Sequence, residues 1–138
     1  MELIEKVKGL RVSLLSLRIS AFIVMFVWTI EKFLNPQHSI GILKRFYMIE
    51  GLGVNIVYAL GVLQLLLVLG FVAGFKKRFT YGSILILHGI STLSTWSKLI
   101  DPWGPRNLLF FTAIPMLAAL FALYKMREHD TLLTLDKA

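Results

Sequence analysis

The sequence predicts an all-α membrane protein: a transmembrane four-helix bundle with a short interfacial helix between the first and second spans. Hydrophobic residues make up 57% of the chain and charged residues 17%, against roughly 45–50% and about 25% in soluble domains. A chain of 138 residues buries too little surface to hide so much apolar area from water. The apolar residues also fall in four runs near the roughly 20-residue length that crosses a bilayer.

The four predicted spans cover residues 14–34, 53–75, 79–99 and 107–124 of a single membrane domain, 1–138. The second run is almost unbroken, and the third is the most polar. Long continuous runs favour helices, because strands that cross a membrane alternate apolar and polar residues. We therefore expect four transmembrane helices.

Two local features modify this pattern. The first connection, residues 35–52, is too long for a turn and carries Ile42, Phe46 and Ile49 at helical spacing. This spacing predicts a short helix lying in the outer interface of the membrane. In the fourth run Pro115 lacks a backbone N–H, which predicts a kink.

The distribution of cations predicts the orientation. Lys and Arg are in excess in both terminal tails and in the 76–78 connection, as is typical of cytoplasmic segments. Both termini are therefore expected in the cytoplasm, at a bacterial or archaeal cytoplasmic membrane. Trp28, Trp96 and Trp103 fall at the opposite face, like an interfacial aromatic belt. Arg18, near the cytoplasmic end of its span, is expected to snorkel to the headgroups.

Composition excludes several functions. The chain has no cysteine, so it forms no disulfide or thiolate metal site of its own. Its net charge of +7 is spread between apolar runs, so we expect no nucleic-acid partner. No P-loop, dinucleotide fingerprint, G-x-S-x-G or H-E-x-x-H motif is present. The three histidines, His38, His88 and His129, fall at different depths, so no metal site is predicted.

The first group of candidate site residues lies at the outer helix ends. Glu31 and Lys32 are ionisable groups near the edge of the hydrocarbon, where such groups are costly unless paired or hydrated. We expect Glu31 to pair with Lys98 or Arg106, with Asn107 nearby. Two interpretations remain open: a salt-bridge cluster that ties the helices together, or a site that binds a ligand or handles protons.

The second candidate is His88, near the middle of the third span, with Thr92 one turn away on the same side. A neutral imidazole there can bond a quinone carbonyl or pass a proton. The alternative is an interhelical hydrogen bond, to Gln64 or Thr112. The ligand hypothesis predicts a cavity that opens toward the outer leaflet and is bounded by Trp28, Glu31, His88, Thr92, Trp96 and Asn107.

Part of the chain resembles a known family. Residues 17–18 and 31–36 resemble the first helix of DoxX-type membrane proteins, and residues 106–110, followed by Pro115, are similar to the family's last helix. The chain departs from the family at residues 28–29, where Trp-Thr replaces a common glycine. The resemblance implies an inner-membrane four-helix bundle. Its relatives include subunits linked to quinone-dependent sulfur oxidation and, more distantly, MauE-type proteins that assist disulfide formation.

Two function classes follow. The first is a DoxX-like membrane subunit associated with quinone-linked or sulfur/thiol redox chemistry, which binds a small amphipathic ligand near the outer face. A quinone is then the candidate cofactor, and a redox protein the candidate partner. The second is a non-enzymatic scaffold or small-molecule or lipid-binding protein that stabilises a partner. The sequence assigns no catalytic residue, and homo-oligomerisation stays open.

Overall fold

The computed structural model describes residues 1–136, and every regular element within them is a helix. Three segments are long and apolar enough to cross a membrane: α1 (Glu2–Leu34), α3 (Val54–Val72) and the segment Asn107–Lys125. The last segment combines a 3₁₀ helix, η1 (Asn107–Thr112), with α6 (Ala113–Lys125). The all-α class is thus confirmed, together with three helices of membrane-spanning character.

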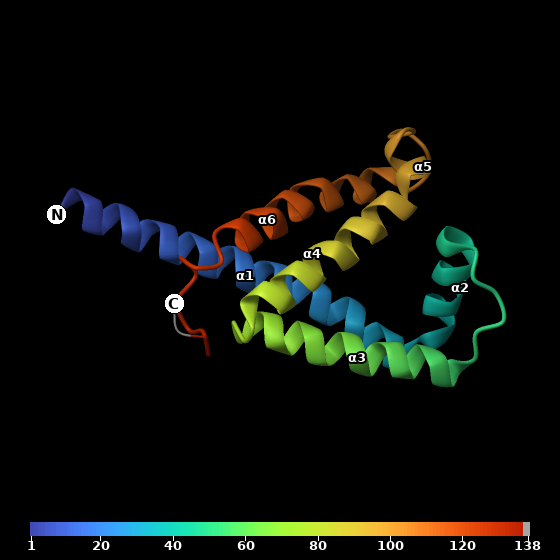
Figure 1. Cartoon of the computed structure of the whole chain (residues 1–138). Helices are drawn as coiled ribbons and strands as arrows, with labels where there is room; N and C mark the ends of the chain where they lie inside the picture. Colours follow the sequence, from blue (N-terminus) through green and yellow to red (C-terminus); the bar gives the residue numbers. More distant parts are fainter. Residues whose placement is uncertain (137–138) are drawn as a thin grey trace.

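The helices pack as two pairs that diverge toward one end of the molecule. The ribbon of α1 runs along α3, and α4 (Lys77–Ser94) runs along α6 (Figure 1). We call the end with residues 73–76 and the C-terminal segment 126–136 the tail end. The other end, which holds α2 (Pro36–Tyr47) and α5 (Trp96–Leu99), is the loop end.

Residues 2–13 and the first predicted span form one continuous helix, α1. The buried side chains of α1 recur every three or four residues and so form one stripe along the helix. They are Leu14, Arg18, Ala21, Met25 and Thr29. The N-terminal third of α1 projects beyond the rest of the molecule (Figure 1), with Leu3 and Ile4 exposed. Only the part of α1 after about Leu10 packs against the other helices.

The predicted short helix between the first two spans is present as α2. It begins at Pro36, whose missing N–H costs nothing in a first helical turn. The side chain of Asn35 caps this turn by accepting a hydrogen bond from the backbone N–H of His38. Phe46 of α2 packs against Phe110 of η1, with ring centroids 6.2 Å apart.

The third predicted span is interrupted, contrary to expectation. Residues 79–99 divide into α4 and α5, with a break at Thr95. The hydroxyl groups of Ser94 and Thr95 donate to the carbonyl oxygens of Ser91 and Thr92, and such bonds compete with the helical ladder. Pro115, where a kink or a polar partner was expected, lies in the first turn of α6, directly after the change from the 3₁₀ helix η1.

The core joins all four long helices near the tail end. Phe71 of α3 meets Tyr81 of α4 edge-on, with ring centroids 5.1 Å apart, and both side chains are buried. Small residues allow close approach between helices. A Cβ on Gly61 would lie 2.8 Å from the Phe33 ring, and one on Gly82 would lie 3.2 Å from the Tyr124 ring.

Candidate functional site

A buried ion pair occupies the tail end, where snorkelling was expected. Arg18 lies on the buried stripe of α1, so its side chain points into the molecule. Its Nη1 donates to Oδ1 of Asp130 at 2.7 Å, and the two side chains are 1% and 0% exposed. The hydroxyl of Tyr81 donates to Oδ2 of the same carboxylate at 2.6 Å. The snorkelling prediction for Arg18 is therefore wrong, because an internal carboxylate solvates the guanidinium.

The same cluster fastens the C-terminal segment to the helices. Nη2 of Arg18 donates to the carbonyl oxygens of Leu132 and Leu133, at 2.5 and 3.2 Å. Lys77 of α4, which is also buried, donates through Nζ to the carbonyl oxygens of Asp130 and Arg127, at 2.6 and 3.2 Å. The charged groups buried here thus solvate one another and the backbone of the tail.

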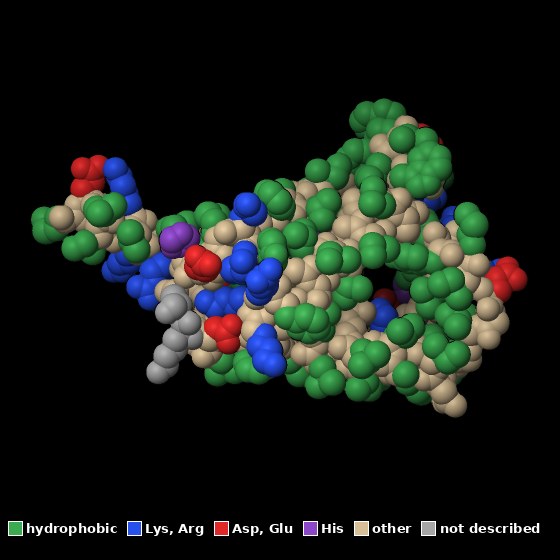
Figure 2. Space-filling model, in the orientation of Figure 1, with side chains coloured by type: hydrophobic (Ala, Val, Ile, Leu, Met, Phe, Trp, Pro, Cys, Tyr) green, Lys and Arg blue, Asp and Glu red, His purple; other side chains and the backbone are tan. Residues whose placement is uncertain are grey.

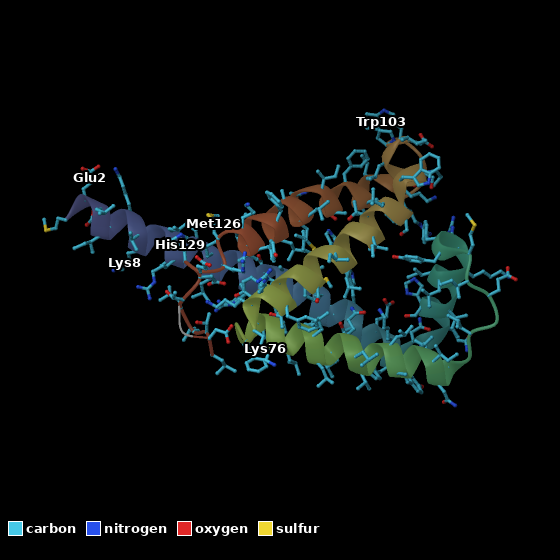
Figure 3. The ribbon with its side chains drawn as sticks, in the orientation of Figure 1. Glu2, Lys8, Lys76, Trp103, Met126 and His129 are labelled. Carbon is cyan, nitrogen blue, oxygen red and sulfur yellow. The ribbon has the colours of Figure 1, made fainter. Side chains whose placement is uncertain are left out.

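Backbone hydrogen bonds complete this attachment. The N–H groups of Leu135 and Asp136 donate to the carbonyl oxygens of Ala73 and Gly74, at 2.8 and 3.0 Å. Gly74 has a φ of 62°, and a Cβ there would lie 2.5 Å from Thr134. Only glycine therefore suits both the backbone turn and the close tail. Figure 3 shows Lys76, Met126 and His129 gathered at this end.

The sequence did carry one signal for this cluster. Arg18 falls four residues after Leu14 and three before Ala21, so it shares their helix face. An arginine on the apolar face of a helix requires an internal anion. Its partner, however, lies in a short polar tail with no periodicity, which only the folded chain brings near.

Among the predicted site residues, Trp28 and His88 lie together. Their rings stack, with centroids 6.2 Å apart and planes inclined by 20°. Nε2 of His88 donates to the carbonyl oxygen of Ala113 at 3.0 Å, and Thr92 donates to the carbonyl oxygen of His88 at 2.7 Å. The pair therefore links α1, α4 and α6.

The hydrogen bond of His88 determines its tautomer. A carbonyl oxygen only accepts, so Nε2 carries the proton, and Nδ1 of the neutral ring is an acceptor. Nδ1 is buried and has no hydrogen-bond partner within residues 1–136. The expected partners of His88 are wrong: Gln64 instead donates to Oγ1 of Thr29, at 2.9 Å, and Thr112 donates to its own helix.

Glu31 contacts His38 of α2 instead of the expected Lys98 or Arg106. Its Oε1 lies 2.6 Å from Nδ1 of His38, and both side chains are partly exposed. The chain turns back into α2 directly after α1, which brings His38 closer than Lys98 or Arg106. Lys32, the next residue, is half-buried.

The remaining predicted residues lie apart from this pair. Trp96 is 61% exposed, and Arg106 is an exposed residue with a φ of 62°. Asn107 is buried, but its Nδ2 donates to the carbonyl oxygen of Asp101 at 2.8 Å, which stabilises the 101–107 turn. The structure thus brings together Trp28, His88 and Thr92.

A hollow lies at the loop end of the molecule. The space-filling view shows a hollow bounded by α4, α2 and α3, with acidic and basic side chains visible in its depth (Figure 2). Apolar residues of α3 and α4 are exposed along this half of the molecule, among them Leu60, Leu63, Ile90 and Leu93.

No family model, curated protein or solved structure matches the chain. Within residues 1–136, no group of three or more His, Asp and Glu side chains is placed to hold a metal ion. The groups that the described residues offer for function are hydrogen-bonding groups, stacked aromatic rings and buried charges.

Proposed function

We propose that the chain is a multi-pass integral membrane protein that binds a small amphipathic ligand in the hollow at its loop end, as a subunit of a redox system. The observation that carries the proposal is the stacked Trp28–His88 pair, with Nδ1 of His88 left without a partner. A buried acceptor without a partner costs free energy. A ligand hydroxyl group would recover that cost.

The proposed membrane placement includes α4 as the fourth span. Helix α4 packs against both α3 and α6, so a bilayer that surrounds those helices also surrounds α4. Its polar groups support this, because the hydroxyl groups of Thr92 and Ser94 donate to carbonyl oxygens of the same helix, as lipid requires. The cations of the tail end favour a cytoplasmic location for that end and for both termini.

The proposed ligand is a quinol-type molecule, flat and apolar with hydroxyl groups. Trp28 offers a ring for stacking, and Nδ1 of His88 accepts a hydrogen bond, so the reduced form suits the site better than a quinone carbonyl does. Nδ1 is covered in the present arrangement. Trp28, the partly exposed ring stacked on His88, is the neighbour that we expect to turn aside when a ligand enters.

The redox assignment and the redox partner protein rest on the resemblance to DoxX-type proteins described above. A second candidate function is a scaffold that stabilises a partner protein. The projecting N-terminal third of α1, with its exposed apolar side chains, favours that function. The two functions differ in whether the protein itself retains a ligand.

The test is ligand retention by the purified full-length protein. Organic extraction and mass spectrometry of the detergent-solubilised protein should recover a quinone. Retention of added decylubiquinol should fall about tenfold in His88→Leu, as for the loss of a hydrogen bond worth about 1.4 kcal/mol. It should also fall in Trp28→Leu, which removes the stacking ring. Trp96→Leu, which changes an exposed tryptophan, is the matched control. Equal retention by all three variants would exclude the site and leave the scaffold function.

A further inference from the structure

We propose that the turn between α3 and α4 binds the headgroup of an anionic phospholipid in the leaflet at the tail end. A pocket of about 490 Å³ lies here, lined by Lys76, Lys77, Arg78, Phe79 and Asp136. The lining of this pocket thus contains three cationic side chains and one carboxylate, that of Asp136. The inference depends on the proposed membrane placement and is independent of any ligand at His88.

The three cations have different roles. Lys77 is buried, and its ammonium group already donates to the tail carbonyl oxygens of Arg127 and Asp130. Lys76 and Arg78 are exposed, and neither forms an ion pair with a carboxylate within residues 1–136. These two side chains therefore have free donors for the phosphate oxygens of a lipid.

The chain itself shows that this turn holds an oxyanion. Oδ2 of Asp136 accepts a hydrogen bond from the backbone N–H of Lys77 at 3.0 Å. Lys77 is the first residue of the 18-residue helix α4, whose first N–H groups have no partner within the helix. The carboxylate uses only part of the donor capacity of the pocket, and positive charge remains in excess.

The neighbouring aromatic residues favour a lipid over a soluble phosphate. Phe75 and Phe79, on either side of the cations, are 47% and 66% exposed. The ammonium group of Lys76 lies 5.6 Å from the centre of the Phe75 ring. Apolar rings beside cations suit the boundary between acyl chains and headgroups, where basic residues next to a span attract anionic lipids.

The experiment measures lipid binding by the full-length protein in detergent. Native mass spectrometry should show phosphatidylglycerol bound about tenfold more tightly than phosphatidylcholine, which carries no net charge. The double variant K76Q/R78Q should lose this preference. K8Q/K125Q is the matched control, because it removes two exposed lysines from α1 and from the last turn of α6, and it should keep the preference.

Three results would overturn the proposal. If K8Q/K125Q lost the preference for phosphatidylglycerol to the same extent, the net positive charge of the protein would attract the lipid without a specific site. No preference in the wild-type protein would mean that no site exists, and competition by soluble glycerol phosphate at the concentration of the lipid would mean a site for free phosphate. D136N should bind phosphatidylglycerol at least as tightly as the wild type, because a like charge is removed. Decylubiquinol retention, measured on the same samples, separates this test from that of the proposed function.

Discussion

Arg18 of α1 and Asp130 of the C-terminal segment form an ion pair shielded from solvent, with Nη1 and Oδ1 2.7 Å apart. The two residues are 112 positions apart in the sequence, so the pair joins the first helix to the end of the chain. Burying two charges is costly, and the pair persists because Tyr81 and tail carbonyl groups add further hydrogen bonds, although Nε of Arg18 has no partner within residues 1–136. The tail is therefore a structural part of the molecule.

Asp130→Asn should destabilise the protein strongly. It leaves the guanidinium of Arg18 buried without a counter-charge, which costs about 3–5 kcal/mol. Thermal unfolding in detergent measures the effect. Glu128→Gln, two residues away and exposed, is the matched control and should leave stability unchanged.

The double variant Arg18→Met/Asp130→Leu refines this prediction. It replaces both charges by apolar groups, so it should recover much of the stability that Asp130→Asn loses. If the double variant is less stable than Asp130→Asn, the cluster stabilises the fold through more than charge pairing.

Attachment of the tail should weaken at low pH. Hydrogen bonds from the backbone N–H groups of Lys77 and Lys76 lower the pKa of Asp136 below its ordinary value of 3.8. The folded state therefore favours the ionised carboxylate. This contribution is complete above the pKa of the unfolded chain and is lost as the pH falls through the lower, folded value.

Hydrogen exchange at the amides of Leu135 and Asp136, which donate to the carbonyl oxygens of Ala73 and Gly74, should detect the change. After correction for intrinsic rates, protection should fall as the medium is acidified through this window. Asp136→Asn should show low protection that does not vary with pH over the same range. A pH-dependent loss of equal size in Asp136→Asn would assign the effect to another group.

Thr29→Val should cost about 1 kcal/mol, as expected for an interhelical hydrogen bond in a membrane protein. The hydroxyl of Thr29 is buried and accepts the amide N–H of Gln64 at 2.9 Å, which joins α1 to α3. Thr112→Val, at an exposed threonine, is the control. The double variant Thr29→Val/Gln64→Leu should recover stability, because no amide is left unpaired; if it does not, packing alone explains the loss.

The sequence predicted the helices well and their polar partners poorly. Run length placed α1 and α3, because lipid demands a minimum helix length. Trp28 and His88, which were both expected to bound one cavity, stack on each other. The break at Thr95 was missed because it depends on hydroxyl groups that bond the backbone. The partners of Arg18 and His88 were missed because a tail without periodicity and a backbone carbonyl oxygen leave no pattern in the sequence. The partner of Glu31 was missed because the pattern that predicts α2 does not show how α2 folds back against α1.

The proposed orientation predicts opposite labelling at the two ends. The chain has no native cysteine, so single cysteines report cleanly. A cysteine replacing the partly exposed His38 at the loop end should react with a membrane-impermeant maleimide in intact cells. One replacing the exposed Lys125 at the tail end should react only after permeabilisation, since the cations of that end favour the cytoplasm. The reverse pattern would place the hollow at the loop end toward the cytoplasm, and the phospholipid site in the outer leaflet.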